Sequence, residues 1–274
     1  MSDRDLDKVL AVATSAAKAA GEVIRGVRAR GGVAISFKGT RDLLTEADLA
    51  AERVIIDHIR AAYPDDDIMS EEASPGTVLH GGASRALWII DPVDGTTNFA
   101  QGHHWVGVSI AFAIGGTVVV GVVYAPFVAE MFTAIKGRGA FLNGEQIETS
   151  RADELPRALI GTGFPYERDD LEPVIRRISL VLAACRDIRR FGAASLDICC
   201  VACSRLDGFY ETLSTWDMAA ALLIAKEAGA QNGHLSRVAA ERNIPADMNG
   251  SEMLVAGPGV FSQLRSLLFF DPAS

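Results

Sequence analysis

A short acidic stretch behind an apolar run places the strongest constraint on how this chain of 274 residues can fold. Residues 86–90 predict a buried β-strand, and Asp91-Pro92 should end it because proline cannot donate to a strand ladder. Asp94 and Gly95-Thr96-Thr97-Asn98 follow, with free backbone N–H groups and hydroxyls. Carboxylates suit a hard cation, and amide donors suit an anion such as phosphate. The stretch predicts a site for both, and a polar turn with an aspartate cap is the alternative.

Further acidic residues occur in similar settings elsewhere in the chain. Glu71 and Glu72 follow the apolar pair Ile68-Met69, which is itself short enough to be part of a strand. Asp217 lies in Trp216-Asp217-Met218-Ala219-Ala220, where a helical pattern begins. Several acids at the ends of apolar elements favour a shared site over a single polar turn.

These motifs resemble those of the inositol monophosphatase family, a group of magnesium-dependent and lithium-sensitive phosphatases. The first family signature, D-P-[ILV]-D-G-T-x-N-F, corresponds to residues 91–99, and the second, W-D-x-A-A, corresponds to residues 216–220. The resemblance extends in the family's order from about residue 38 to residue 229. Both signatures are specific, so the resemblance carries expectations about fold, metals and reaction.

The fold that the resemblance implies is α/β (α+β), a layered α-β-α-β-α sandwich of the inositol monophosphatase and fructose-1,6-bisphosphatase type. We expect one domain over residues 1–274, with an N-terminal lobe of about 1–150 and a C-terminal lobe of about 151–274. Alternating strands and helices in the second half predict a partly parallel sheet. Helices are expected over residues 3–29, from 45–48 onward, and over 173–184, 194–203, 216–228 and 260–268. Strands are expected over residues 33–37, 106–114, 117–124, 131–135, 158–162, 188–191, 208–210 and 252–256.

Residues 105–129 carry no charge and are long enough to cross a bilayer. Gly115-Gly116 divides this stretch, Pro126 ends it, and β-branched residues dominate it. A buried β-hairpin is therefore predicted in place of a membrane span.

The resemblance implies a set of metal ligands for two or three Mg²⁺ ions. One ion is expected to take Glu71, Asp91 and the backbone carbonyl of Val93, and a second is expected to take Asp91, Asp94 and Asp217. Asp91 would then bridge the two ions. All of these ligands are oxygens, as Mg²⁺ prefers.

The resemblance also implies catalytic and substrate-binding residues. Thr96, supported by Asp48 and with Glu71 nearby, would orient and deprotonate the attacking water. Thr45-x-x-Asp48 also matches a capping box, which alone would explain both residues. The substrate contacts that the resemblance implies are Asp94, the amides of Gly95 and Thr96, the segment Gly192-Ala193-Ala194, Glu211 and Asp217. Glu211 stands six residues before Asp217 where the family pattern has seven, which brings its reach into the pocket, and inositol itself, into question.

The leading interpretation is Mg²⁺-dependent hydrolysis of a small phosphate monoester, most simply inositol monophosphate. Alternatives within the same superfamily are fructose-1,6-bisphosphatase, histidinol-phosphatase and nucleotide 3′-phosphatase. A regulatory protein that retains the fold is the non-enzyme alternative. Such a protein would be expected to have lost a ligand carboxylate, and this chain retains all of them. The expected partner is a small phosphorylated polyol or sugar, and the family is usually homodimeric.

Net charge and the pattern of the N-terminal residues limit the kinds of partner and the location that the sequence predicts. A net charge of −9 argues against a nucleic-acid backbone as partner. The N-terminus has no basic segment followed by an apolar one, so we expect a cytoplasmic protein without a signal peptide or membrane span. Cys200 and Cys203 form a C-x-x-C without a second pair, and buried thiols are the favoured interpretation. His103-His104 is assigned a loop or packing role.

Overall fold

The computed structural model describes residues 4–31, 35–37, 43–73, 86–165 and 171–270. The first half of this part forms two long helices and one large sheet. Its elements are α1 (Leu6–Arg30), β1 (Ile35–Phe37), β2 (Leu43–Thr45), α2 (Glu46–Ala62), β3 (Asp67–Ser70), β4 (Ala86–Asp94), α3 (Thr96–Ala100), β5 (Gly107–Ile114), β6 (Thr117–Ala125), β7 (Glu130–Ile135), β8 (Ala140–Leu142) and β9 (Glu145–Ile147). Strands β3 to β9 form a seven-stranded sheet in chain order, in which β3 and β4 are parallel and the other neighbours are antiparallel.

The second half forms a five-stranded sheet with the order β11-β10-β12-β14-β13. Its elements are η1 (Leu155–Arg157), β10 (Leu159–Thr162), α4 (Glu172–Ala184), β11 (Asp187–Arg189), α5 (Ala194–Ala202), β12 (Gly208–Glu211), α6 (Thr215–Glu227), β13 (Gln231–His234), α7 (Arg237–Ala240), η2 (Ala246–Met248), β14 (Met253–Ala256) and α8 (Pro258–Leu268). Strand β10 pairs in parallel with both β11 and β12, which confirms the predicted partly parallel sheet.

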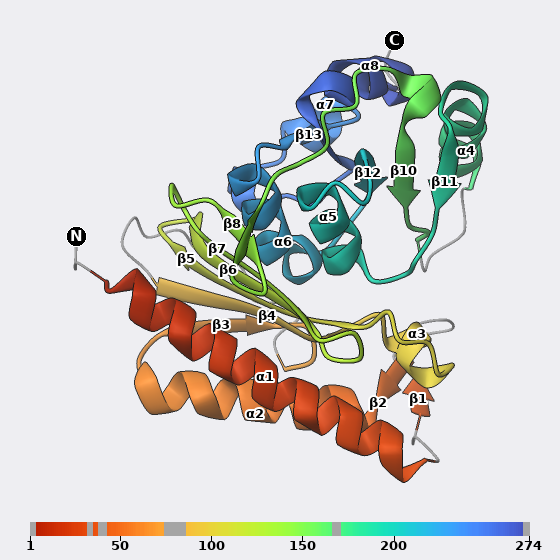
Figure 1. Cartoon of the computed structure of the whole chain (residues 1–274). Helices are drawn as coiled ribbons and strands as arrows, with labels where there is room; N and C mark the ends of the chain where they lie inside the picture. Colours follow the sequence, from red (N-terminus) through yellow and green to blue (C-terminus); the bar gives the residue numbers. More distant parts are fainter. Residues whose placement is uncertain (1–3, 32–34, 38–42, 74–85, 166–170, 271–274) are drawn as a thin grey trace.

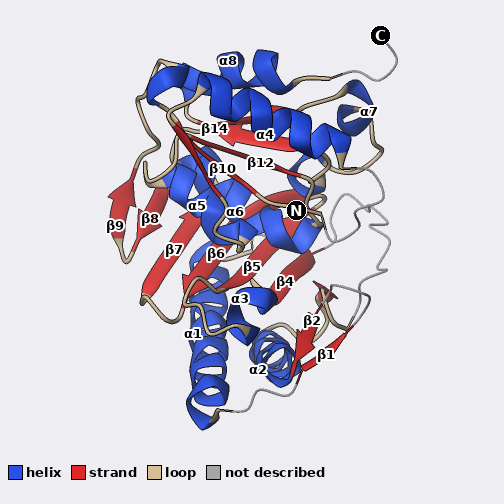
Figure 2. Ribbon diagram, turned by 90° about the vertical axis from the view of Figure 1, so that its right-hand side faces the viewer, coloured by secondary structure: helices blue, strands red, loops and turns tan. Residues whose placement is uncertain are grey.

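The helices and sheets stack in five layers, as Figures 1 and 2 show. Helices α1 and α2 cover the outer face of the seven-stranded sheet, and α5 and α6 lie between the two sheets. Helices α4 and α8 cover the outer face of the five-stranded sheet. The predicted α-β-α-β-α sandwich is therefore confirmed. The division into two lobes near residue 150 stays a prediction; β9 of the large sheet ends at Ile147 and β10 of the other sheet begins at Leu159.

Local sequence explains where the first helix begins. The Asp5 carboxylate accepts hydrogen bonds from the amides of Asp7 and Lys8 and so caps the N-terminus of α1. The apolar stripe predicted from periodicity is buried against the sheet, with Val9, Ala13 and Ile24 fully covered. The predicted helix over residues 3–29 is thus confirmed to within a few residues.

The charge-free stretch forms the predicted hairpin of β5 and β6 in the middle of the large sheet. Gly121 lies where α6 crosses β6, and a Cβ built on it would approach the carbonyl oxygen of Ala220 to 2.6 Å. Only glycine permits this close contact, which brings α6 and its Asp217 onto the sheet. Among the described residues, no helix combines the length and apolarity that a membrane crossing requires.

The predicted end of the acidic strand is wrong. Strand β4 continues through Pro92 to Asp94, because the register with β5 shifts between Asp91 and Asp94 and proline is tolerated at such an irregularity.

The polar strand β13 and helix α7 were also not predicted. Of the expected strand over residues 33–37, residues 33 and 34 lie outside the described part. Cys200 is a buried free thiol as predicted, whereas Cys203, also predicted to be buried, is half-buried; Cys199 is buried and Cys185 is half-buried.

Candidate active site

The acidic residues that the sequence singled out come together from three elements. Glu71 directly follows β3, and its amide donates to the carbonyl of Ile90 on β4 at 3.3 Å. Asp91 and Asp94 lie near the end of β4, and Asp217 lies in the first turn of α6. Because β3 and β4 are parallel, their carboxyl ends meet at the same edge of the sheet, and α6 packs across this sheet.

Burial and mutual repulsion dominate the electrostatics of this cluster. Burial raises the pKa of Asp91 well above its ordinary value, and the charges of Glu71, Asp94 and Asp217 raise it further. The pKa of Asp217 is also raised well above its ordinary value, first by burial and then by Asp94 and Glu71. Carboxylates that repel one another in a buried place require either protons or cations.

Asp94 is held by the N-terminus of α5. Its two carboxylate oxygens accept from the amide of Ala194 at 3.1 Å and from the amide and hydroxyl of Ser195 at 2.7 and 2.5 Å. Burial raises the pKa of Asp94 to about 6, although the bonds from Ser195 and Ala194 act in the opposite direction. The predicted segment Gly192-Ala193-Ala194 is thus placed directly beside the cluster.

Helix α6 brings Asp217 to the site through its capping box. The Asp217 carboxylate accepts from the amide of Ser214 at 2.9 Å, and the Ser214 side chain accepts in return from a backbone amide of the first turn. The cap fixes the first turn of α6, and the aspartate that serves it also faces Asp94 and Glu71.

Asp48 is buried and connects the capping box of α2 with the acidic turn. It accepts from the amide of Thr45 at 2.8 Å and from the Thr45 hydroxyl, while its other oxygen accepts from the Thr96 hydroxyl at 3.0 Å. The Thr96 hydroxyl also lies 3.0 Å from the carbonyl oxygen of Val93. Burial raises the pKa of Asp48, and the nearby charge of Glu71 adds to the increase. The capping-box prediction is confirmed, and the same aspartate meets Thr96.

Gly95 joins β4 to α3 and lies close to the loop before α5. Its φ of 90° is in the left-handed region, and a Cβ built on it would approach the carbonyl oxygens of Gly192 and Trp105 to 3.1 Å. Glycine here lets the start of α3 lie against the loop before α5. The first amides of α3 have no acceptors within the helix.

Glu211 ends β12, and its carboxylate interacts electrostatically with Asp94 and Asp217. Burial raises the pKa of Glu211 to about 8, the charges of Asp197 and Asp94 raise it further, and Arg190 lowers it. A Cβ built on Gly163 would overlap the Glu211 carboxylate at 1.9 Å, so the side chain lies over the end of β10. Its carboxylate also adds to the raised pKa of Asp217.

Two polar residues near the acidic cluster, Asp197 and Ser195, were not identified from the sequence. Asp197 is buried on α5, accepts from the indole N–H of Trp105 at 2.8 Å, and has a pKa raised to about 8, mainly by burial. Ser195 binds Asp94 as described above. A lone acid in the apolar segment 194–202 was a usable signal for Asp197, because buried acids need partners. The serine hydroxyl gave no such signal.

The donor chemistry of the cluster fits a hard divalent cation. Its ligating atoms are carboxylate oxygens, and their repulsion would be relieved by positive charge. No three acidic, histidine or cysteine side chains in the described residues already have the arrangement of a formed metal site. The cluster offers the ligands, and cation binding would draw their oxygens together.

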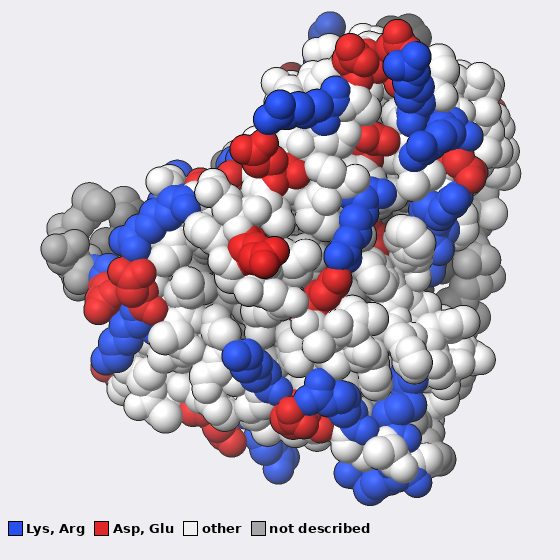
Figure 3. All heavy atoms as spheres, in the orientation of Figure 1, with Lys and Arg blue, Asp and Glu red and all other residues white. Residues whose placement is uncertain are grey.

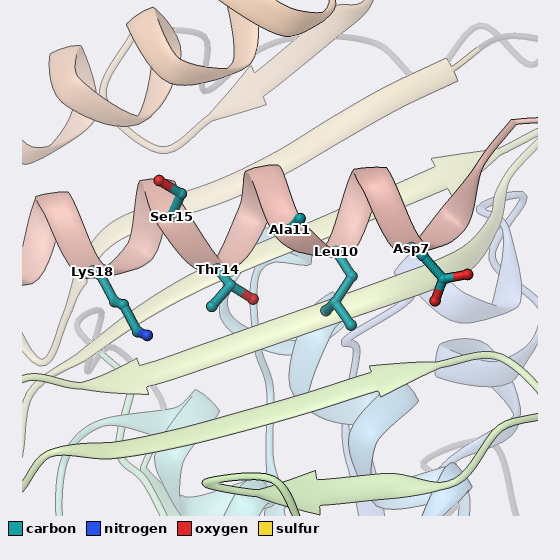
Figure 4. A pocket seen from close by; sticks show the side chains of 6 residues that line it. All are labelled: Asp7, Leu10, Ala11, Thr14, Ser15 and Lys18. Carbon is teal, nitrogen blue, oxygen red and sulfur yellow. The ribbon is translucent and has the colours of Figure 1, made fainter.

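Two surface hollows lie away from this cluster. One, of about 470 Å³, runs along α1 and is lined by Asp7, Leu10, Ala11, Thr14, Ser15 and Lys18, as Figure 4 shows. The other, of about 800 Å³, lies between α4 and α7 and includes Arg176, Arg242 and Thr212. Neither hollow contains one of the four clustered acids among its described lining residues.

Comparison with known proteins identifies the family of this chain. The family model described as "Inositol monophosphatase family" matches residues 5–262. The chain belongs to the inositol monophosphatase family. Inositol monophosphatase 1 of Solanum lycopersicum is 44% identical over 229 residues, which cover 82% of this chain and 83% of that protein. Nus factor SuhB of Pasteurella multocida (strain Pm70) is 40% identical over 227 residues, covering 82% of this chain and 84% of that protein.

Solved structures of family members share the fold. The extragenic suppressor protein suhB from Bartonella henselae has a TM-score of 0.86 and 32% identity, and the match covers 95% of this chain and 98% of that chain. The inositol monophosphatase from Anabaena (Nostoc) sp. PCC 7120 has a TM-score of 0.80 and 32% identity, covering 97% of this chain and 96% of that chain. Family and fold together support a metal-dependent phosphatase of this superfamily.

Proposed function

We propose that this chain hydrolyses a small phosphate monoester with Mg²⁺, and that inositol monophosphate is its preferred substrate. The observation that carries the proposal is the group of Glu71, Asp91, Asp94 and Asp217 beside the start of α3, in which Asp91 and Asp94 are buried and Glu71 and Asp217 are half-buried. Such a group favours cations, and the first amides of a helix, which have no acceptors within the helix, suit an anion. Phosphate ester and divalent cation satisfy both needs at one place.

The ligands of the proposed ions follow the family pattern. Glu71, Asp91 and the Val93 carbonyl would hold one Mg²⁺, and Asp91, Asp94 and Asp217 would hold a second, with two or three ions in all. Bound Mg²⁺ supplies Lewis-acid stabilisation of the phosphoryl oxygens and lowers the pKa of water. Lithium sensitivity is part of the same proposal.

The side chains around Thr96 would position the nucleophilic water. The Thr96 hydroxyl donates to Asp48 or to the Val93 carbonyl, each at 3.0 Å, and its oxygen would accept a hydrogen bond from the water. Glu71 would take the proton that the water loses on attack. The Gly95 and Thr96 amides would bind phosphate oxygens, with Gly192, Ala193 and Ala194 forming the facing wall of the pocket. Asp94, Asp217 and Glu211 would contact the substrate from its other side.

Thr96→Ala is expected to lower kcat by on the order of a hundredfold or more, because loss of a group that positions the water removes general acid–base assistance. Metal affinity should change little, since the Thr96 side chain is not among the proposed ligands. Steady-state kinetics and Mg²⁺ titration of the variant measure both quantities. Thr97→Ala, at the exposed neighbouring position, is the control. Loss of metal affinity in Thr96→Ala would place Thr96 among the ligands instead.

Glu211→Ala is expected to lower kcat/KM for inositol phosphates about tenfold or more, because it leaves substrate hydroxyls without their acceptor. An aryl phosphate, which has no such hydroxyls, should be hydrolysed almost as by the wild type. Glu211→Gln keeps one acceptor oxygen and should have an intermediate effect. If Glu211→Ala has equally weak effects on both substrates, Glu211 does not recognise inositol hydroxyls. Histidinol phosphate or a sugar phosphate would then be favoured as the substrate.

Surface charge and family membership support the remaining proposals. On the face drawn in Figure 3, basic and acidic side chains are interspersed, so this face offers no continuous basic surface to a nucleic-acid backbone. We propose a cytoplasmic homodimer.

A panel of phosphate esters tests the proposed substrate directly. Phosphate release with Mg²⁺ is compared for inositol monophosphate, fructose 1,6-bisphosphate, histidinol phosphate and a nucleotide 3′-phosphate. We expect the highest kcat/KM for inositol monophosphate. A clear preference for another ester would assign the chain to the corresponding sister activity.

The relatives named Nus factor SuhB favour a second candidate, a regulatory role for the folded protein. Exchange of the chromosomal gene for one that encodes Asp91→Asn separates the two candidates. A phenotype equal to that of a deletion supports the phosphatase, whereas wild-type behaviour supports a role that needs no turnover.

A further inference from the structure

Arg28, near the C-terminal end of α1, reaches the helix that carries Thr96. Its guanidinium Nη2 donates to the carbonyl of Phe99 at 2.7 Å and to that of His103 at 3.3 Å. Phe99 belongs to the last turn of α3, and Thr96 is the first residue of this helix. Arg28 therefore contacts the end of α3 that lies opposite the proposed site.

Aromatic rings enclose the same guanidinium. Its central carbon lies over the ring of Phe99 and over the ring of Phe127, at 4.6 Å from each centroid. The ring of His104 stacks on Phe127, with centroids 5.4 Å apart and planes inclined by 19°. Burial lowers the pKa of Arg28, and its Nε is buried without an acceptor among the described residues. Among the described residues, the cation is thus held by ring faces and two carbonyls and by no carboxylate.

Helix α3 depends on such contacts for its orientation. Its five residues are far fewer than an independently stable helix needs, and no side chain caps its N-terminus. At that end the Thr96 hydroxyl meets Asp48 and Val93. Near the other end Arg28 binds the carbonyl of Phe99, where a positive charge also interacts favourably with the helix dipole.

We propose that Arg28 is a positioning residue, which fixes the orientation of α3 and thereby keeps the Thr96 hydroxyl aligned with Asp48. The catalytic part of this inference rests on the proposed phosphatase function. Its structural part, the ordering of residues 96–103 by Arg28, can be measured without any substrate.

Arg25 provides a matched control on the same face of α1. Its guanidinium donates to the carbonyl of Pro126 at 2.8 Å and to the Tyr124 hydroxyl at 3.3 Å, so it holds α1 to the connection between β6 and β7. The hydrogen bonds of Arg25 in the described part of the chain do not include α3. Arg25→Met should therefore loosen the packing of α1 without releasing α3.

The test compares Arg28→Met, Arg28→Lys and Arg25→Met by steady-state kinetics, thermal unfolding and hydrogen exchange. Arg28→Met should lower kcat about tenfold, because a small misplacement of a positioning group is costly, and leave KM within about twofold. Exchange of the amides of Phe99, Gln101 and His103, which bond within this turn, should accelerate about fivefold or more. Arg28→Lys keeps the charge but not the planar stack, so partial recovery is expected. Arg25→Met should lower Tm about as much as Arg28→Met does, but it should leave kcat unchanged.

A double-mutant cycle with Thr96→Ala tests whether Arg28 acts through Thr96. In that background Arg28→Met should change kcat by less than about twofold, because the group it positions is already absent. An additive effect, a wild-type kcat in Arg28→Met, or an equal loss of kcat in Arg25→Met would each overturn the proposal. If the wild type hydrolyses no phosphate ester, the proposed function fails, and hydrogen exchange alone decides whether Arg28 orders α3.

Discussion

Asp91→Asn is expected to lower kcat by about a thousandfold or more and, in the absence of divalent cations, to raise Tm. Asparagine has the shape of aspartate and can still accept the hydrogen bond from the Val93 amide, so the turn should persist. The proposed bridge between two ions is lost, and several kcal/mol of charge stabilisation in the transition state is lost with it.

The gain in stability has a separate physical cause. Asp91 is fully buried, and Glu71, Asp94 and Asp217 all repel its charge. A neutral side chain at this position removes that repulsion from the cation-free protein. Kinetics with saturating Mg²⁺ and thermal unfolding in a chelator measure the two effects.

Asp57→Asn provides the matched control, since Asp57 is exposed on α2. It makes the same chemical change outside the site and should alter neither activity nor Tm appreciably. Wild-type turnover in Asp91→Asn would mean that the acidic turn is only structural. If Asp91→Asn has a lower Tm than the wild type in chelator, the charge of Asp91 is compensated by other groups of the protein.

Local patterns predicted most of the elements because their causes are local. The apolar stripe of α1, the hairpin of β5 and β6, and the capping box at Thr45 are determined by neighbouring residues. The end of β4 was misplaced because Pro92 normally stops a strand, whereas here a register shift against β5 accommodates it. Strand β13 is polar and forms the sheet edge, so its pairing with β14 left no apolar alternation to detect.

The acidic residues of the candidate site and the contact of Asp48 with Thr96 were predicted through motifs, and the other supporting contacts were not. Glu71, Asp91, Asp94 and Asp217 stand in recognisable motifs, and the fold places them around one another. The hydroxyl of Ser195 reaches Asp94 from a residue 101 positions later in the chain. Arg28 reaches Phe99 across 71 positions, and neither contact leaves a periodic or local signal in the sequence.

Removal of divalent cations is expected to abolish turnover, because the proposed ligands are all oxygens and the reaction is phosphoryl transfer. Phosphate release is measured after exhaustive chelation and again after Mg²⁺ is restored. Ca²⁺ and Zn²⁺ additions serve as controls for ion identity. Substantial turnover without a divalent cation would contradict the proposed mechanism.

The same removal should make stability depend on pH in a defined direction. The pKa of Asp94 is about 6 in the folded, cation-free protein, above its ordinary value of 3.8, and burial also raises the pKa of Asp91 and Asp217. Between these values the folded state holds more protons than the unfolded state, so unfolding free energy falls as pH rises. The stabilisation is complete below about pH 4 and is lost as pH rises through about 6 and beyond.

Bound Mg²⁺ favours the charged carboxylates and should reverse this loss. The Tm difference between Mg²⁺-loaded and chelated protein is therefore expected to widen from pH 5 to pH 8. Asp91→Asn should show a smaller widening, because one of the repelling charges is absent at every pH. A Tm difference that stays constant over this range, or that narrows, would mean that the clustered carboxylates are neutralised by groups of the protein itself and not by cations.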